Sequence, residues 1–489
     1  MTFNLINTPW IPVLTREGDM RKISPRQILD PAIVVLDWTR PDFNLACLEF
    51  LIGVAYAACA PEDIDDWEDG TVMPEEYWNK ALDRIAPAFN LTGEGPLFMQ
   101  DPTELRDGDK LGTDALFIDA PGASGCKKNN DIFVPRNRYT DLSLEEAAMA
   151  LFTLQTYTGG GGRGYRVGVR GGGPMTILLD PSTTLWEMIW ANVPYGRRAR
   201  CHEFPWMQPA RDSSNENAAG MRTLGNRSVP EVELFFGLPR RLRLIEQDGR
   251  ITGVLSCSNG TKYEACLHPL SNYYADNKGN LLSKKMSFQR LGYENWLGIA
   301  VPASGADPRC RAMTLRNLPE RYPGEFVGVV VGGWDVDNSN GKGFTMSRTV
   351  IHPLDEDRQV LLRGMIEAAE IVGFRLRSGL KGVGGARYLD FAGVFYDRTQ
   401  PDMIRLYADL SAGRSMVEIG EEWHRIIRAT ALEIFDEVAA PAIKTASDKI
   451  LAALSAGRNG LGAQLARNHS RGAKICALLQ LPQNEVLAA

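Results

Sequence analysis

The densest group of residues able to do chemistry is a glycine and arginine block, GGGGRGYRVGVRGGGP, at residues 159–174. Gly159, Gly161 and Gly164 satisfy the GxGxxG pattern of dinucleotide-binding loops, and Asp180 follows them. That pattern needs a strand before the glycines and a helix after them, so that the pyrophosphate meets a helix N-terminus. Here a helical pattern precedes the glycines and an alternating pattern follows. The context argues against a nucleotide-binding enzyme that uses residues 159–164, which remains the alternative hypothesis.

The same block suits a different chemistry, close contact with DNA. Glycines let a backbone take positive φ and approach another surface without a Cβ in the way. Arg163, Tyr165, Arg166 and Arg170 are interleaved with them. This combination suits the minor groove, where charge and width are read more than base identity. A solvated surface loop has the same composition, so the residue types alone leave both interpretations open.

Two further segments combine cations with aromatic residues, a combination that can bind phosphate and stack bases. In YGRRARCHEFPWM, at residues 195–207, a solvated helix end is the equal alternative. In GCKKNNDIFVPRNR, at residues 125–138, core packing of the apolar residues is the alternative to an RNA-stacking or partner-docking loop. The residues that define the second segment are Lys127, Lys128, Phe133 and Val134.

Spacings typical of catalysis are missing. None of the five histidines lies in HExxH or HxH, and no GxSxG occurs. Cys257, Cys266 and His268 are close enough in sequence to form part of a zinc site, but a fourth ligand is not evident. The sequence therefore predicts a protein that is not an enzyme and holds no cofactor or metal.

Charge and composition limit the function further. The chain has a formal net charge of −6, so any contact with nucleic acid must be local rather than driven by a global positive field. No apolar run approaches the ~20 residues of a membrane span, and the first residues lack the layout of a signal peptide. The eight cysteines contain no CxxC pair. These features predict a cytoplasmic protein with reduced thiols.

Local patterns predict several elements in the first part of the chain. Residues 3–15 and 20–24 form a strand pair, in which Pro9 and Pro12 confine the first strand to a sheet edge. Residues 42–60 are apolar around the whole helical circumference, which predicts a helix buried on most sides. Ser143 and Glu146 form a capping box that begins a helix running to about Tyr157.

The second half predicts antiparallel hairpins over residues 235–350 and helices after His352. Pro401 and Pro441 are expected at helix starts or breaks. The predicted fold class is α+β. A large mixed N-terminal domain with antiparallel hairpins and helices covers residues 1–353, and a C-terminal four-helix bundle covers residues 354–489.

Several separated segments resemble one known family in the same order along the chain. They are NTPWIPV, DWTRPDFNLACLEFLIG, GPLFMQ, the FV of DIFVPRN, GGGGRGYRVGVRGGGPMT and the closing helical region. The chain resembles, over essentially its whole length, the CasA family, the large subunit of the type I-E CRISPR Cascade complex. The resemblance implies a large mixed domain followed by a four-helix bundle, in agreement with the boundary predicted above.

The resemblance also implies a function. Such a subunit binds the crRNA-guided complex through an N-terminal loop, recognises the protospacer-adjacent motif in duplex DNA, helps to open the duplex and recruits a helicase-nuclease. The protein reads the motif, and base pairing with the guide reads the remaining sequence. The implied partners are the other Cascade subunits, the 5′ end of the crRNA, double-stranded target DNA and the helicase-nuclease.

Individual residues inherit roles from the resemblance. Phe133 and Val134 fall on the loop that docks against the guide and neighbouring subunits. Asn295 falls near the wedge, a polar residue on a hairpin tip, with Trp296 beside it as an aromatic able to stack on an unpaired base. The family's lysine finger has no lysine at the aligned stretch RITGVLSCS, where Arg250 and Lys262 are the nearest cations. The glycine loop in the minor groove comprises Gly159, Gly160, Gly161, Gly162 and Gly164, with Arg163 and Arg166 beside it.

Overall fold

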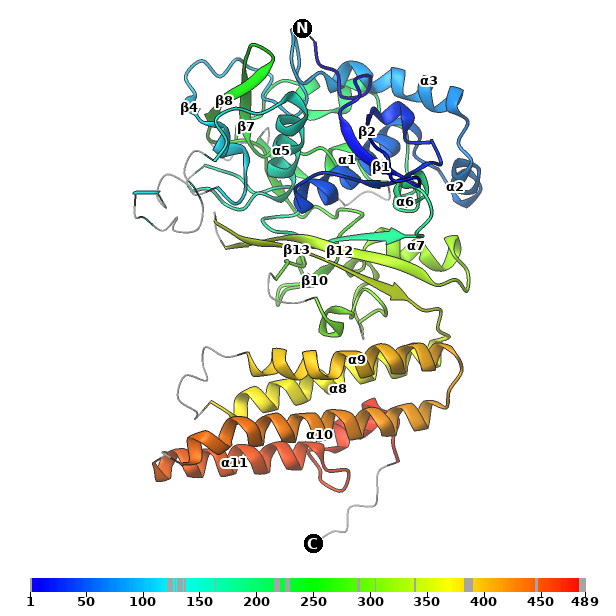
Figure 1. Cartoon of the computed structure of the whole chain (residues 1–489), viewed down its shortest axis with the longest axis vertical. Coiled ribbons are helices and arrows are strands. Elements are labelled where there is room, and N and C mark those ends of the chain that lie inside the picture. Colours follow the sequence, from blue (N-terminus) through cyan, green and yellow to red (C-terminus); the bar gives the residue numbers. More distant parts are fainter. Residues whose placement is uncertain are drawn as a thin grey trace. The chain divides into compact units, whose positions relative to one another are not determined.

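The chain folds into two compact units in the computed structural model (Figure 1). The structure describes residues 2–120, 126–127, 129, 135, 138–162, 164–214, 220–224, 229–287, 291–303, 305–337, 340–381, 390–444 and 447–482. Unit 1 comprises Met1–Gln289, Arg309–Arg321 and Val327–Thr349, and unit 2 comprises Arg290–Pro308, Tyr322–Phe326 and Val350–Ala489. The last change of unit therefore lies four residues before the expected boundary at 353 and 354. Two earlier segments, Arg290–Pro308 and Tyr322–Phe326, also belong to unit 2. The two units therefore cannot be separated by one boundary in the sequence.

Unit 1 mixes helices with small sheets, as the predicted α+β class requires. Its helices are α1 (Pro41–Cys59), α2 (Ile64–Thr71), α3 (Glu75–Ile85), α5 (Leu144–Tyr157), α6 (Leu185–Trp190) and α7 (Met313–Arg321). Its strands are β1 (Ile11–Thr15), β2 (Met20–Ile23), β3 (Ile33–Leu36), β4 (Asp109–Leu111), β5 (Thr176–Asp180), β6 (Met221–Thr223), β7 (Arg241–Gln247), β8 (Arg250–Cys257), β9 (Lys262–Glu264), β10 (Tyr273–Ala275), β11 (Leu281–Ser283), β12 (Val327–Asp337) and β13 (Asn340–Ile351), whose last two residues belong to unit 2. Its 3-10 helices are η1 (Pro25–Gln27), η2 (Ala86–Phe89), η3 (Thr113–Leu116), η4 (Cys201–Glu203), η5 (Pro205–Met207), η7 (Val232–Leu234) and, beginning at the unit boundary, η9 (Pro308–Cys310).

The sheets are small and mostly antiparallel. Their strand orders are β2-β1-β3, β13-β12-β5, β4-β8-β7, β10-β11 and β6-β9. Among the described residues, β6–β9 is a parallel pair, whereas β1–β2, β1–β3, β10–β11, β5–β12, β4–β8 and β7–β8 are antiparallel. The β7–β8 hairpin turns at Asp248 and Gly249, which both have positive φ, as a tight two-residue hairpin turn requires. The prediction of antiparallel hairpins between residues 235 and 350 is confirmed for this pair.

Helix α1 is the centre of unit 1. It packs against α3, α5, α6 and β12, and 94% of its most apolar window is buried inside the structure. It is the one helix of the described residues that is long and apolar enough to cross a membrane, and burial identifies it as a core helix. Its aromatic neighbours Phe89, Phe98 and Phe236 surround Phe50 at ring distances of 5.8–6.2 Å. The prediction of a helix buried on most sides is confirmed.

Helix α5 leads directly into the glycine block. The Ser143 hydroxyl accepts a hydrogen bond from the Glu146 amide at 3.2 Å, and the Glu146 carboxylate accepts one from the Ser143 amide at 3.1 Å. This reciprocal capping box satisfies two amides that the helix itself leaves unpaired. The predicted start and the predicted end at Tyr157 are both confirmed.

The prediction that β1 lies at a sheet edge is wrong, because β1 is the middle strand of its sheet. Strand β3 pairs only with Val13, Leu14 and Thr15, and so avoids the missing amide of Pro12. The Pro12 carbonyl still accepts a hydrogen bond from the Asp37 amide at 2.9 Å. A proline is therefore tolerated where the neighbouring strand uses only its carbonyl group.

Unit 2 is helical. Its elements are η8 (Tyr293–Asn295), α8 (Glu356–Gly379), α9 (Phe391–Ser411), α10 (Met416–Ile443), α11 (Asp448–Leu465) and α12 (Ala473–Leu478). Helix α8 packs on each of the other α-helices of the unit, and α10 packs on α9 and α11 (Figure 1). One stripe of apolar residues on α8 is fully buried; its members are Leu362, Met365, Ile366, Ala369 and Val372.

The two prolines expected at helix starts or breaks lie inside helices instead. Pro401 is in the interior of α9, and Pro441 is near the end of α10. Each costs its helix one backbone hydrogen bond. The buried side chains on both sides of Pro401, Phe395 and Leu406 among them, hold α9 in one piece through packing.

Candidate nucleic-acid interface

The glycine block begins at an anchor built by Arg240, just before β7. The Arg240 guanidinium donates hydrogen bonds to the Thr158 hydroxyl at 2.8 Å and to the Gly159 carbonyl at 2.6 Å. It also lies over the Tyr165 ring, 5.0 Å from the centroid. Burial lowers the pKa of Arg240 to about 10. Arg240 therefore fixes the backbone at Gly159 through a hydrogen bond and packs on the ring of Tyr165 in the same block.

A second anchor holds the other side of the loop. The Asn259 amide donates to the Gly164 carbonyl at 2.6 Å. Arg166 donates to the hydroxyl and the carbonyl of Ser213 at 2.8 and 3.0 Å, and the Ser213 hydroxyl donates to the Gly260 carbonyl at 2.7 Å. The turn between β8 and β9 thus fixes the loop immediately after its glycines.

Between the two anchors the loop is open. A Cβ atom at Gly160 or Gly162 would meet nothing within 4 Å, whereas one at Gly161 would come within 2.7 Å of the Arg240 guanidinium. Gly161 and Gly162 are exposed, and Gly162 has a φ of +103°. Arg163, the cation predicted beside them, lies outside the described residues. The apex, residues 160–162, thus presents backbone with almost no side chain.

The suggested DNA contact at Arg170 is wrong, because this side chain is buried. Its guanidinium donates to the Glu49 carboxylate at 2.6 Å, with 1% and 3% of the two side chains exposed. It also donates to the hydroxyls of Thr176 and Ser271 at 2.9 and 3.2 Å. Tyr157 and Thr176 donate to the same carboxylate. Arg170 therefore ties the end of the glycine block to helix α1.

The two candidate cations for the lysine finger differ in position. Lys262 begins β9, directly after the turn that anchors Gly164, and its ammonium pairs with Glu264 at 2.6 Å. Arg250 begins β8 and forms an ion pair with Asp141. Because β8 is eight residues long, the rise of ~3.3 Å per residue places Arg250 roughly 25 Å from that turn. Only Lys262 is brought close to the glycine loop.

The expected wedge on a hairpin tip is also wrong. Tyr293–Asn295 is a single turn of 3-10 helix, η8, in unit 2. Trp296 is 5% exposed and packs against Tyr407 with ring centroids 5.4 Å apart. The ring therefore belongs to the core of the helical unit and is not available to stack on a base. Asn295 is half-buried beside it.

The other predicted segments give a mixed outcome. Lys127 is exposed, while Lys128, Phe133 and Val134 lie outside the described residues. In the segment 195–207, Phe204 and Trp206 are fully buried in the aromatic core of unit 1, so they do not stack on bases.

No metal centre or nucleotide fold appears among the described residues. No group of three or more His, Cys, Asp or Glu side chains in that part of the chain could hold a metal ion. Cys266 contacts the backbone carbonyls of Arg222 and Glu264, and His268 accepts from the Leu270 amide at 3.1 Å. Helix α5 precedes the glycines and strand β5 follows them, which is opposite to the order that a dinucleotide site needs.

Sequence patterns missed the residues that position the loop. Arg240, Ser213 and Asn259 carry its anchors, yet they are distant in sequence from Gly159 and belong to no motif. The alternating pattern after residue 235 predicted hairpins but gave no signal that the half-buried Arg240 contacts the glycine loop.

The fold and the loop can be compared with known proteins. Residues 4–434 match the family described as CRISPR-associated protein Cse1. Thermus thermophilus CasA (Cse1) has the same fold, with a TM-score of 0.72 at 20% identity over 95% of this chain and 99% of that one. Thermobifida fusca Cse1 gives 0.71 at 18% identity over 98% of each chain. A chain of a CRISPR RNA-guided surveillance complex gives 0.70 at 16% identity over 94% of this chain and 99% of that one.

These similarities define a CRISPR-associated protein with an α+β fold. No curated protein matches the chain. The match over most of its length assigns the family: the chain belongs to the Cse1 family of CRISPR-associated proteins, also called CasA. The family predicted from the sequence segments is confirmed.

Proposed function

We propose that this chain is a non-catalytic subunit of a cytoplasmic, type I-E CRISPR surveillance complex that reads a protospacer-adjacent motif in duplex DNA, promotes strand opening and recruits a helicase-nuclease. Its partners are the other Cascade subunits, the 5′ end of the crRNA, the target duplex and the helicase-nuclease. Family membership supports the assignment, as does the fold shared with a chain of an RNA-guided surveillance complex.

The open apex of the glycine loop is the observation that carries DNA recognition. A minor groove about 6 Å wide admits a protein backbone only where few side chains project from it. Residues 160–162 meet this requirement, since two of the three positions face empty space. Their anchors at Arg240 and Asn259 hold the backbone in place before DNA arrives, which lowers the entropic cost of binding.

The positive charge near the glycine loop is confined to a few residues, as DNA recognition by a protein of net negative charge requires. Lys262 follows the anchoring turn, and a nearby phosphate would compete with Glu264 for its ammonium. We assign Lys262, rather than Arg250, as the cation that accompanies the glycine loop. The net charge of −6 then limits binding to sites where these local groups fit.

Other regions have separate roles in this proposal. The segment with Lys127, Lys128, Phe133 and Val134 docks the chain on the guide and the neighbouring subunits. The four long helices α8–α11 act as a four-helix bundle that forms a rigid second unit.

Replacing Gly160 tests the proposal with little disturbance of the free chain. A valine there meets no atom within 4 Å, and Gly160 is not among the glycines with positive φ. In the minor groove the same side chain would overlap DNA, at a cost of about 1–3 kcal/mol by analogy with overpacking. We expect Gly160→Val in the assembled complex to weaken motif-dependent duplex binding by about 5- to 150-fold, measured by electrophoretic mobility shift.

Gly112→Val is the matched control. Gly112 is exposed, also has empty space at its Cβ position and has an extended backbone with φ of −70°. Both variants should melt within a few degrees of the unmodified chain. If Gly160→Val bound the motif as tightly as Gly112→Val, the glycine apex would not lie in the groove.

A further inference from the structure

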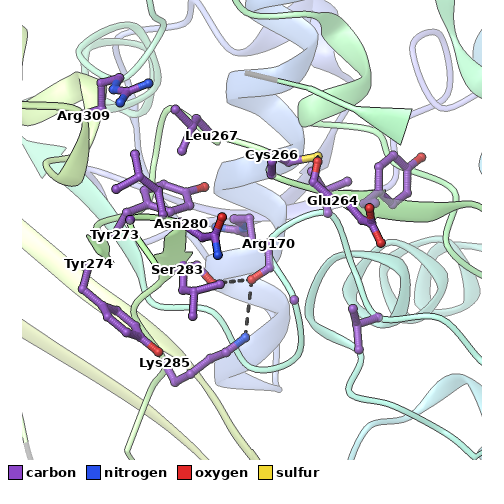
Figure 2. A pocket seen from close by; sticks show the side chains of 18 residues that line it. Arg170, Glu264, Cys266, Leu267, Tyr273, Tyr274, Asn280, Ser283, Lys285 and Arg309 are labelled. Atoms are coloured by element: carbon purple, nitrogen blue, oxygen red, sulfur yellow. Dashed lines mark hydrogen bonds between the residues drawn. The ribbon is translucent and has the colours of Figure 1, made fainter. Parts of the chain in front are cut away.

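A cavity of about 600 Å³ lies at the end of the glycine block, away from the open apex. Its lining includes Arg170 and Gly171 of the block, Glu264 of β9, and the β10–β11 hairpin (Figure 2). The volume falls within the range of small-molecule sites, about 300–1,000 Å³. The proposed recognition of duplex DNA makes no use of this cavity.

Lys285 gives the cavity a positive charge that no carboxylate in the described part of the chain pairs with. Among the described residues, no Asp or Glu forms an ion pair with its ammonium, which donates to the Arg170 carbonyl at 3.5 Å. The Ser283 hydroxyl donates to the same oxygen, so that acceptor is shared. Glu264 lines the cavity but pairs with Lys262 at 2.6 Å.

The lowered pKa of Lys285 agrees with an ammonium that has no carboxylate partner among the described residues. The Lys285 side chain as a whole is exposed, but partial desolvation of its ammonium at the cavity, together with the charge of Arg170, lowers the pKa to about 8. The Arg170 guanidinium itself is neutralised by Glu49 in the core. An anion in the cavity would supply the missing counter-charge.

An exposed aromatic ring lies on the same wall. Tyr274 of β10 is 46% exposed and lines the cavity, whereas its neighbour Tyr273 is buried and accepts a hydrogen bond from the His268 amide at 2.6 Å. In the view of Figure 2, Tyr274 and Lys285 lie at the same end of the cavity, and Arg309 lies at the opposite end. A ring that keeps this much exposure beside a cation can stack on a base while the cation meets a phosphate.

We propose that this cavity binds a phosphorylated nucleotide, with its phosphate at Lys285 and its base on Tyr274. The nucleotide has two possible sources, a free mononucleotide or one unit of an unpaired strand. The inference goes beyond the function proposed above, because the glycine loop and the duplex play no part in it.

The charge is tested by titrating the full-length chain with thymidine 5′-monophosphate and with fluorescent decathymidylate. Lys285→Met keeps an unbranched side chain one atom shorter and removes the charge, whereas Lys285→Arg keeps the charge. Lys278→Met, on the exposed turn of the same hairpin and outside the cavity, is the matched control for net charge. We expect Lys285→Met to weaken binding roughly 10- to 100-fold, the loss given by one charge-assisted hydrogen bond. The affinities of Lys285→Arg and Lys278→Met should stay within about threefold of the unmodified chain, a small change that the altered net charge alone explains.

The aromatic wall is tested with Tyr274→Ala and Tyr274→Phe. Because stacking is sequence-tolerant and lost with the ring, Tyr274→Ala should weaken nucleotide binding roughly tenfold and leave inorganic phosphate binding unchanged. Tyr274→Phe should bind like the unmodified chain. Equal losses for phosphate and nucleotide would contradict a base on Tyr274.

The two probes separate the sources. A Lys285-dependent loss for the monophosphate alone identifies a free nucleotide, and a loss for decathymidylate identifies an unpaired strand. Absence of saturable binding of both probes, or equal effects of Lys285→Met and Lys278→Met, would overturn the proposal. Since the probes are unpaired and the chain is tested alone, this outcome is independent of whether Gly160→Val affects duplex recognition.

Discussion

Replacing Arg170 should unfold unit 1 more easily rather than remove a DNA contact. The Arg170 and Glu49 side chains are 1% and 3% exposed and 2.6 Å apart. Arg170→Met leaves the carboxylate buried without its cation, which costs about 3–5 kcal/mol. At about 1.4 kcal/mol per tenfold, the unfolded population should rise by roughly two to four orders of magnitude. The midpoint of urea unfolding, followed by far-ultraviolet circular dichroism, measures this loss.

A second substitution should return part of the stability. In Glu49→Gln with Arg170→Met, no charge remains buried, and the amide oxygen can still accept from Tyr157 and Thr176. The double variant should therefore be more stable than Arg170→Met alone, which makes the two effects non-additive.

Arg166→Met is the matched control within the same block. Arg166 is only half-buried and bonds to Ser213, so its loss should cost about 1 kcal/mol. If Arg170→Met unfolded at the urea concentration of the unmodified chain while duplex affinity fell, the buried ion pair would be wrong and Arg170 would be a DNA contact.

Two further predictions follow from burial and charge. Trp296→Ala should destabilise the helical unit by about 3–5 kcal/mol in thermal melts, because the ring is 5% exposed, whereas Asn295→Ala should cost under about 1 kcal/mol; similar melting of the two variants would argue against the buried ring. Affinity for thymidine 5′-monophosphate should stay level between about pH 7 and pH 8, where the phosphate (second pKa about 6) keeps both charges, and should fall above pH 8, because Lys285, with its pKa lowered to about 8, loses its proton there. The affinity of Lys285→Arg should not change over this pH range. Burial raises the pKa values of Tyr263, Tyr273 and Cys266, so these groups do not titrate near pH 8. If the affinity of Lys285→Arg also fell above pH 8, a group other than Lys285 would cause the effect.

Sequence reasoning succeeded where the cause of a structure is local. The capping box of α5 involves residues three apart, and the apolar circumference of α1 is a property of one continuous segment. The edge position expected of β1 failed because a partner strand distant from the pattern, β3, begins its pairing just beyond Pro12. The prediction that Pro401 starts or breaks a helix failed for the same reason, since tertiary packing around α9 outweighs the local preference of proline to end a helix.

The candidate site shows the same division. Composition alone indicated the glycine loop, but not which of its arginines faces the core. Arg170 pairs with a carboxylate 121 residues earlier in the chain, so its burial depends on a contact that no local pattern contains. Arg240, 81 residues after Gly159, is equally distant from the loop that it anchors. The resemblance to a known family placed the wedge near Asn295 with Trp296 beside it as a stacking aromatic, but the Trp296 ring is a core residue in the structure.

The central claim is that this chain supplies motif recognition to an RNA-guided complex. The most direct measurement compares the guide-loaded complex assembled with and without the chain, and its affinity for duplexes that carry the motif or a scrambled motif. The account predicts that discrimination between the two duplexes appears only when the chain is present and weakens with Gly160→Val. A complex that discriminates equally well without the chain would contradict it.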